Sequence, residues 1–156
     1  MISFIGDYTV KLDAKGRLTF PSAFKKRMGE AVSQGLVVKR DVYVKCLVLY
    51  PKEEWDREVE RIRARTNPYN KKQAQTLRQF FAGTFELTLD SNNRILIPKL
   101  LLDYAEAGED LVLAGQAGKI EVWDLRKYEE SCMPGDSYGS DIEELLGGPD
   151  EPAPGR

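Results

Sequence analysis

GDYTVKLDAKGRLTFP (residues 6–21) and GTFELTLDSNNRILIP (residues 83–98) are two copies of one pattern, and they lie 77 residues apart. Five of the 16 aligned positions are identical, and five more exchange similar apolar or small residues. Because the identities fall at structurally demanding positions, a duplicated unit explains them better than coincidence. The identical pairs are Gly6/Gly83, Leu12/Leu89, Asp13/Asp90, Arg17/Arg94 and Pro21/Pro98.

Each copy has the pattern of a strand, a tight loop, a second strand and a short helix. In the first copy, apolar and polar residues alternate on both sides of residues 13–16, which is the period of a half-buried strand. Aspartate suits the first position of a turn and glycine can adopt positive φ at the last, so 13–16 is the loop. A helix is predicted from Pro21 to about Met28. The residues expected to face inward are Tyr8, Val10, Leu12, Leu18 and Phe20.

The second copy predicts the same elements, with a helix from Pro98 to about Ala107. Its expected inward residues are Phe85, Leu87, Leu89, Ile95 and Ile97. Further strands are predicted at residues 36–38, 46–50, 111–113 and 119–123. Between the copies, apolar residues at helical spacing predict two helices, separated by the Asn67-Pro68 break. Gly, Pro, Ser and acidic residues dominate after residue 130, which predicts a mostly disordered tail. Within this tail, Ile142, Leu145 and Leu146 could form one helical turn that docks on a partner.

The composition is that of a folded globular protein, with 42% hydrophobic and 31% charged residues in a chain of 156. No apolar run is long enough for a membrane span, and the N-terminus lacks the features of a signal peptide, so we expect a cytoplasmic protein. The chain has no histidine, which removes the commonest general base and metal ligand. Cys46 and Cys132 are too far apart for a zinc site of paired cysteines, so two free thiols and no metal or cofactor are expected.

The charge is distributed unevenly along the chain. Residues 1–82 hold 17 basic and 9 acidic residues, a net charge of +8, whereas residues 83–156 hold 6 basic and 16 acidic residues, a net charge of −10. A basic half can attract a polyanion although the whole chain carries −2. Two oppositely charged surfaces could equally complement each other within or between subunits. Charge alone leaves both interpretations open.

The loops carry the residues that point most clearly to a function. In both copies an aspartate and an arginine flank the loop, as Asp13/Arg17 and Asp90/Arg94, and their side chains can meet and stiffen it. In the first copy, donors and positive charges on a rigid loop suit phosphates and guanine edges. The outward residues there are Thr9, Lys11, Lys15, Arg17 and Thr19. The second copy offers Glu86, Thr88, Asn92, Arg94 and Leu96, a poorer set for DNA, and Leu96 suggests that something covers it.

The duplicated Asp-x-x-Gly-Arg loop with its following proline resembles the MraZ family, within the AbrB-like swapped-hairpin DNA-binding fold. The segments CLVLYP (46–51) and GQAGKIEVWD (115–124) resemble the strands that end the two copies of that family. The resemblance implies an α+β, mainly β protein with two tandem β-barrel units related by a pseudo-twofold axis. We accordingly expect a first repeat at 1–52, a helical connector at 53–82, a second repeat at 83–130 and the acidic tail at 131–156.

The same resemblance implies a transcriptional regulator that binds repeated short sites in the promoter of the division and cell-wall gene cluster. It implies double-stranded DNA as partner, a ring-like homo-oligomer, a location at the nucleoid, and neither a membrane nor a small-molecule substrate. The family's DNA-contacting loop carries over to Lys15 and Arg17, whereas only Arg94 matches in the second copy. There Asn93 replaces the family's glycine, and asparagine tolerates the left-handed conformation. The expected DNA-binding residues are Lys11, Lys15, Arg17, Thr19 and Arg94, and the expected structural residues are Asp13, Gly16, Pro21, Asp90, Asn93 and Pro98.

Enzymatic motifs are not convincing. The sequence GDSYG at 135–139 fits a hydrolase elbow, but it lies in the predicted tail and no histidine is available. Gly118-Lys119 lacks the remaining positions of a phosphate-binding loop. We therefore predict a DNA-binding regulator and no enzyme. The alternative is an oligomeric assembly protein without specific DNA binding, in which the basic half pairs with an acidic neighbour.

Overall fold

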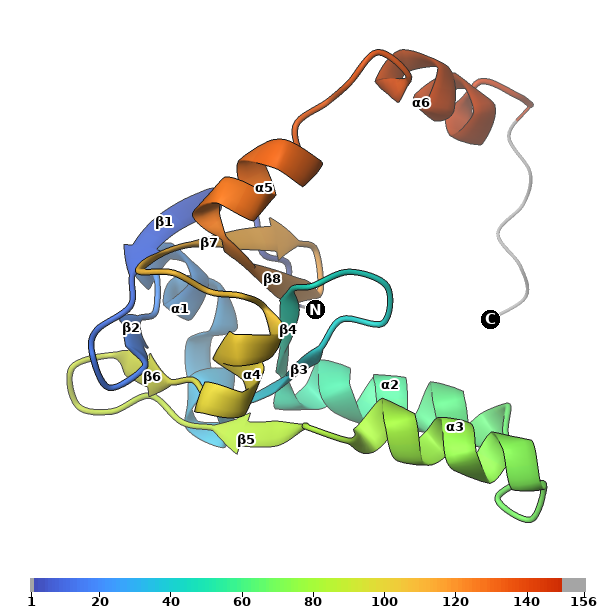
Figure 1. The fold of residues 1–156 in the computed structure, drawn as a ribbon, viewed down its shortest axis with the longest axis horizontal. Helices are drawn as coiled ribbons and strands as arrows, with labels where there is room; N and C mark the ends of the chain where they lie inside the picture. Colours follow the sequence, from blue (N-terminus) through green and yellow to red (C-terminus); the bar gives the residue numbers. More distant parts are fainter. Residues whose placement is uncertain (1, 150–156) are drawn as a thin grey trace.

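A computed structural model describes residues 2–149 of the chain. The first repeat contains four strands, a short helix and a 3₁₀ helix (Figure 1). Its elements are β1 (Asp7–Lys11), β2 (Arg17–Thr19), α1 (Ser22–Met28), the 3₁₀ helix η1 (Gly29–Gln34), β3 (Leu36–Arg40) and β4 (Leu47–Pro51). The second repeat has the same order without the 3₁₀ helix: β5 (Phe85–Leu87), β6 (Arg94–Leu96), α4 (Lys99–Tyr104), β7 (Asp110–Gln116) and β8 (Lys119–Asp124).

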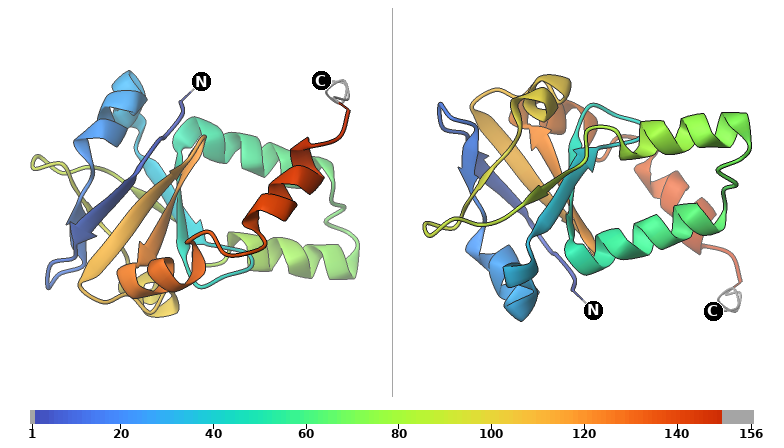
Figure 2. Two further views of the ribbon diagram at one scale, coloured as in Figure 1. Left: turned by 90° about the horizontal axis from the view of Figure 1, so that it is seen from above. Right: turned by 90° about the horizontal axis from the view of Figure 1, so that it is seen from below.

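Within residues 2–149, four further helices lie outside this duplicated pattern. Two of them, α2 (Lys52–Ala64) and α3 (Lys71–Phe81), form a hairpin that projects from one end of the molecule (Figures 1 and 2). The other two, α5 (Leu125–Ser131) and α6 (Tyr138–Leu146), follow the second repeat. The predicted strands and connector helices are therefore present, with ends shifted by a few residues.

The two repeats exchange strands instead of folding side by side. They share one six-stranded antiparallel sheet of order β1-β7-β8-β4-β3-β5, in which β1 of the first repeat pairs with β7 and β5 of the second pairs with β3. Interchanging equivalent strands of the repeats turns this order into its own reverse, as a twofold relation requires. The prediction of two β-barrel units is wrong in this respect: the sheet is open, with β1 and β5 at its edges. A separate barrel cannot close because each repeat gives its first strand to the other.

The second strands of the two repeats pair with each other as a separate two-stranded ribbon. In this ribbon, β2 runs antiparallel to β6, with Leu18 opposite Ile95. Both side chains point into the main core and are completely or almost completely buried. Burial of such side chains stabilises a fold by about 1.5–3 kcal/mol each. The ribbon is thus anchored by the core that both repeats build, which also contains Phe20, Phe24, Leu49, Ile97, Leu101, Leu113 and Ile120.

The helical hairpin covers part of the other face of the sheet. Trp55 of α2 packs against Val37 and Val48, and its ring stacks on Phe80 of α3 with a centroid separation of 5.8 Å. The side chain of Asn70 caps α3 by accepting a hydrogen bond from the backbone N–H of Gln73 at 3.0 Å. This second, smaller core attaches the base of the hairpin and leaves its far end in solvent.

Two features differ from the sequence-based expectations. Phe85, predicted to face inward, lies opposite the buried Val38 but is 39% exposed, because β5 is an edge strand with no neighbour beyond it. The tail at 131–156, predicted to be mostly disordered, contains the nine-residue helix α6. Apolar residues at helical spacing and Asp141 in the first turn favour this helix. The rest of that prediction falls partly on residues 150–156, which lie outside the described residues.

Within residues 2–149, none of the helices combines the length and the hydropathy that crossing a membrane requires.

The loop glycine of the first repeat makes a prediction about stability. Gly16 has a φ of +85°, and a Cβ atom built on it would lie 3.1 Å from the carbonyl oxygen of Ile97. We expect Gly16→Ala to lower the free energy of unfolding by about 1–2 kcal/mol, as measured by urea denaturation. Gly139→Ala is the matched control, since its φ is ordinary and its Cβ would meet nothing within 4 Å. Equal stability of the two variants would contradict the strain at Gly16.

Candidate nucleic-acid interface

One aspartate organises the loop of the first repeat. Asp13 Oδ1 accepts hydrogen bonds from the backbone N–H groups of Lys15 and Arg17, both at 2.9 Å. Its other oxygen, Oδ2, accepts a bond of 2.9 Å from Nε of Arg17. The backbone closes the same loop, because the Gly16 N–H donates to the Asp13 carbonyl at 3.1 Å. Both carboxylate oxygens are therefore used to fix the loop and the direction of the arginine.

The loop of the second repeat has the same bonds. Asp90 accepts from the backbone of Asn92 and Arg94 at 2.8 and 2.9 Å, and from Nε of Arg94 at 3.0 Å. Asn93 adopts a φ of 60°, so it replaces glycine in the left-handed position as predicted. The turn geometry thus survives the loss of the family's glycine.

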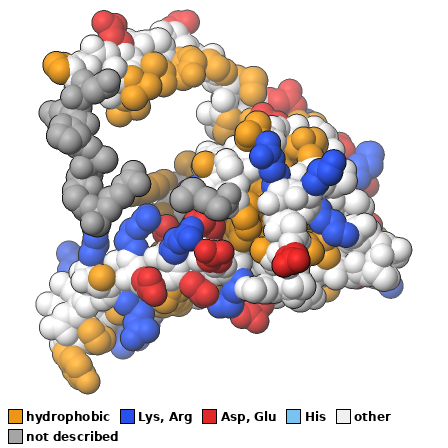
Figure 3. Space-filling model, turned by 180° about the vertical axis from the view of Figure 1, so that it is seen from behind, with side chains coloured by type: hydrophobic (Ala, Val, Ile, Leu, Met, Phe, Trp, Pro, Cys, Tyr) orange, Lys and Arg blue, Asp and Glu red, His pale blue; other side chains and the backbone are white. Residues whose placement is uncertain are grey.

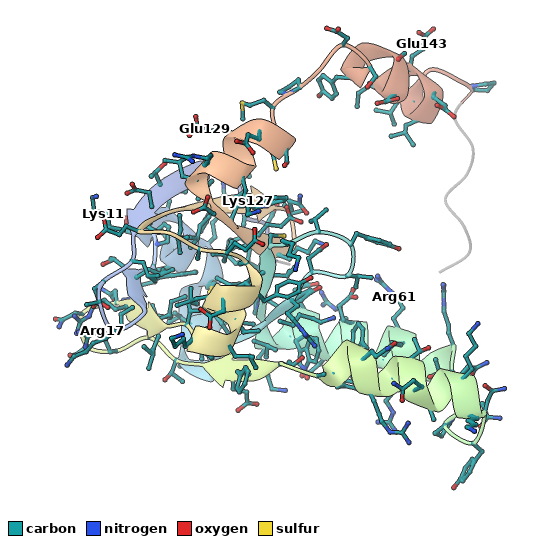
Figure 4. All side chains as sticks on the ribbon, viewed as in Figure 1. Lys11, Arg17, Arg61, Lys127, Glu129 and Glu143 are labelled. Carbon is teal, nitrogen blue, oxygen red and sulfur yellow. The ribbon has the colours of Figure 1, made fainter. Side chains whose placement is uncertain are left out.

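This arrangement leaves the ends of both guanidinium groups available. Each arginine uses Nε for its aspartate, and within residues 2–149 no hydrogen bond occupies the terminal amino groups of either one. The side chains of Arg17 and Arg94 are each 30% exposed. A guanidinium held through Nε presents its other two nitrogens as a fixed pair of donors, the geometry that binds a guanine edge or a phosphate. Figure 4 shows Arg17 at the edge of the molecule away from the helical hairpin.

The hydrogen bonds also set the charge state of the loops. Hydrogen bonds from the backbone, first of all from the N–H of Arg17, lower the pKa of Asp13 below its ordinary value of 3.8. The pKa of Asp90 is lowered for the same reason by the N–H of Arg94. Both carboxylates therefore stay ionised at neutral pH and keep orienting the arginines.

Pairing of β2 with β6 brings the two arginines onto one surface. Opposite residues in the ribbon are Arg17 and Leu96, Leu18 and Ile95, and Thr19 and Arg94. Leu18 and Ile95 face the core, and side chains alternate across a strand, so the other four residues of the ribbon share its outer face. Arg17 and Arg94 are diagonal neighbours on that face, a position at which residues lie about 7–8 Å apart. We call this surface the ribbon face; it consists of Arg17, Thr19, Arg94 and Leu96.

Leu96 is 55% exposed on the ribbon face, so no other described part of its own subunit covers it. The two loops lie at opposite ends of the ribbon because its strands are antiparallel, as the left view of Figure 2 shows. Lys15 is exposed in the first loop. Pro21 and Pro98 occupy the N-cap positions of α1 and α4, as expected for residues that begin a helix.

A shallow groove of about 540 Å³ extends the ribbon face toward β1. It contains the predicted residues Lys11 and Thr19, and also Lys25, which the sequence analysis missed. Lys11 is exposed and forms an ion pair with Asp110 at 3.3 Å. Lys25 lies on α1 and donates a hydrogen bond to the side-chain oxygen of Asn93 in the other repeat.

The contact of Lys25 with Asn93 replaces an apolar contact in the equivalent place. In the other half of the molecule, Leu102 of α4 lies beside Gly16, with its Cδ1 3.4 Å from the position of a Cβ on that glycine. Asn93 thus stands where the first loop has Gly16, and its contact Lys25 stands where the other helix has Leu102. Aligning the two repeats at their offset of 77 residues places Lys25 opposite Leu102, and this mismatch is the sequence signal that could have identified Lys25.

The cysteines do not contribute to this surface. Cys46 is buried and Cys132 is partly buried, and neither forms a disulfide. Cys46 lies near Asp41 and Glu121, the one group of three that has metal-ligand spacing within residues 2–149. Burial raises the pKa of the Cys46 thiol, which disfavours the thiolate that binds metals.

The fold and this surface define a class of protein: a duplicated, strand-exchanged binding protein without an assembled catalytic group on its ribbon face. The family model described as MraZ protein matches residues 3–79 and again residues 80–132. Proteins named transcriptional regulator MraZ are 40% identical in Christiangramia forsetii, over 96% of this chain and 97% of that protein, and 37% identical in Bacteroides thetaiotaomicron, over 94% of each. The relative from Flavobacterium psychrophilum is 38% identical over 94% of each chain.

The chain therefore belongs to the MraZ family, as its loops indicated. This is a family of transcriptional regulators and not of enzymes, which confirms the prediction that the protein is no enzyme.

The loop carboxylates predict a pH dependence. Because their folded pKa values are lowered, their stabilising contribution is complete above pH 3.8 and is lost as the pH falls through the folded values. A variant with Asp13→Asn and Asp90→Asn should be less stable than wild type at pH 7 and should lose less stability between about pH 5 and pH 2. Thermal unfolding at pH 7 measures the first effect, and thermal unfolding between about pH 5 and pH 2 measures the second. Asp136→Asn is the control, and an unchanged acid slope in the double variant would show that these loops do not carry the effect.

Proposed function

We propose that the protein is a sequence-specific DNA-binding transcriptional regulator whose ribbon face enters the major groove. The observation that carries this proposal is the pairing of β2 with β6, which aims Arg17 and Arg94 outward from one rigid two-stranded ribbon. A major groove about 12 Å wide accepts such a ribbon.

Each residue of the ribbon face has a role that suits its chemistry. The paired donors of Arg17 and Arg94 fit the O6 and N7 acceptors of guanine, and Leu96 can contact the methyl group of thymine. Lys15 in the first loop, and Lys11 and Thr19, which line the shallow groove of the protein, suit phosphate oxygens. The second loop takes part through Arg94, although it offers an asparagine where the first loop has Lys15.

A homo-oligomer completes this function. One ribbon makes few contacts with DNA. In a ring, several copies could each bind one of the repeated DNA sites, and together they would supply the affinity that a single ribbon lacks. We assign these sites to the promoter of the division and cell-wall gene cluster, and the protein to the cytoplasm and the nucleoid. The exchanged strands are interpreted as the swapped-hairpin arrangement of AbrB-like proteins, with repeats at 1–52 and 83–130 joined by the connector 53–82.

Substitution of the loop arginines tests the proposal directly. Arg17→Ala should reduce affinity for promoter DNA by about tenfold to a hundredfold for each ribbon that binds, because a bidentate contact is worth about 1–3 kcal/mol. Arg94→Ala should have a similar effect, since its guanidinium is held in the same way. Fluorescence anisotropy with promoter and scrambled duplexes measures both. Arg78→Ala, on an exposed position of α3, is the control. Wild-type affinity of folded Arg17→Ala protein would refute the proposal, and equal binding to both duplexes would favour the assembly alternative.

The loop lysine makes a separate prediction. Lys15→Ala should weaken binding to all sequences alike and reduce the slope of log K against log salt by about one per ribbon, because one phosphate contact is lost. Titrations at several salt concentrations measure the slope. Lys71→Ala, at the start of α3, should leave it unchanged. A slope that stays the same in Lys15→Ala would mean that this lysine does not contact phosphate.

A further inference from the structure

A second cavity lies far from the ribbon face, between the helical hairpin, the end of β3 and α4. Its volume is about 310 Å³. Apolar side chains from three helices and from the loop between β3 and β4 form much of its wall: Val42, Ile62, Phe80 and Tyr104. The remaining lining residues are Lys39, Arg40, Asp41, Thr76, Gln79 and Ala82. We call this cavity the hairpin groove.

The hairpin groove contains a buried cation. Lys39 is only 5% exposed, and its ammonium lies 3.6 Å from the centroid of the Phe80 ring. Within residues 2–149, no carboxylate forms a salt bridge with it. Burial lowers its pKa, and the charge of Asp41 only partly opposes that effect. The carboxylates of Asp41 and Glu58 act on this ammonium without forming a salt bridge to it. A largely shielded ammonium without a salt bridge can be stabilised further by an anionic group from outside.

The rim of the groove is also unusual. The loop between β3 and β4 exposes Val42, Tyr43 and Val44, with Tyr43 92% exposed. An adjoining small pocket is lined by Glu58, Arg61, Ile62, Arg65 and Phe80. Arg61 forms an ion pair with Glu58 at 3.0 Å, whereas Arg65 forms no salt bridge within residues 2–149. The two adjoining hollows hold four cationic side chains against two carboxylates, Asp41 and Glu58. The surface therefore combines an apolar floor and rim with an excess of positive charge, which suits an occupant that is apolar and acidic.

The helix α6 has the complementary character. Ile142, Leu145 and Leu146 follow helical spacing and share one face with Tyr138, and the two leucines are 78% and 74% exposed. Asp141 and Glu143 lie on either side of that face by helical geometry. Figure 3 shows apolar side chains gathered along one side of this helix.

The helix is separated from its own subunit. Within residues 2–149, no hydrogen bond or salt bridge joins α6 to the other elements. It stands away from the sheet beyond a linker of residues 132–137 (Figure 1). Such a projecting helix can reach a neighbouring molecule. It also lies beyond residue 132, where the family match ends.

We propose that α6 of one copy docks in the hairpin groove of a second copy, with its leucines against Phe80 and Ile62 and a carboxylate near Lys39. The contact rests on the proposed function in one respect, because it adds a contact between subunits of the proposed oligomer. Figure 4 labels Glu143 on α6 and Arg61 on the hairpin, the charges that the two surfaces bring to it.

Photo-crosslinking in the full chain tests the contact. A benzophenone amino acid at position 145 should crosslink to residues 39–42 or 76–82, and the product should have the mass of two chains. The same group at position 140, on the opposite side of α6 by helical geometry, is the control and should give little crosslinking. Peptide mapping by mass spectrometry identifies the site. A product with the mass of one chain, or crosslinks elsewhere on the partner, would overturn the proposal.

Matched substitutions test the energetics. Leu145→Asp and Ser140→Asp add the same charge to opposite faces of α6, and neither residue is buried. The dissociation constant between copies, measured by analytical ultracentrifugation, should rise about tenfold or more for Leu145→Asp only, as expected when a leucine is lost from a contact. Lys39→Met, which keeps the packing on Phe80, should weaken association relative to Lys71→Met. Unchanged association in folded Leu145→Asp protein would refute the contact.

The two proposals can fail separately. Crosslinks to the hairpin groove in a protein that does not discriminate promoter DNA would leave the contact standing and remove the regulator function. Specific DNA binding with crosslinks elsewhere would do the reverse.

Discussion

The structure depends on the exchange of strands between the two repeats. The first strand of each repeat forms its backbone hydrogen bonds with a strand of the other repeat: β1 pairs with β7, and β5 pairs with β3. This exchange forces β2 and β6 together, and their inward side chains, Leu18 and Ile95, enter a core that both repeats build. The ribbon face therefore owes its rigidity to the whole molecule, and damage to either repeat would disturb both arginines.

Each loop holds its arginine with an aspartate, and this ion pair must leave the arginine able to bind another group. The direction of the hydrogen bonds makes this possible. Asp13 and Asp90 accept from the backbone and from Nε of their arginines, which leaves the terminal nitrogens directed outward. Their lowered pKa values keep this arrangement intact at neutral pH. The local ion pair is thus a positioning device more than a source of stability.

The two repeats have the same order of strands and the same sheet pairing, but their chemistry differs. Where one half has Gly16 beside Leu102, the other has Asn93 bonded to Lys25. The charge is also uneven, with a net +8 in residues 1–82 and −10 in residues 83–156. Because strand exchange interleaves the two halves in one sheet, this asymmetry distinguishes surfaces of one body. The acidic α6 belongs to the second half alone, whereas the ribbon face takes one arginine from each half.

The sequence by itself determined the duplication, the loop chemistry and nearly all strands and helices, because these follow from periodicity, turn residues and the spacing of 77 residues. It also identified Arg17 and Arg94 as loop arginines. Only the tertiary structure decided that both arginines share one face, since strand partners distant in sequence are chosen by the core and not by local pattern. The open sheet, the exposed edge residue Phe85, the role of Lys25 and the buried charge of Lys39 were hidden for the same reason: each depends on what another repeat or helix places beside it.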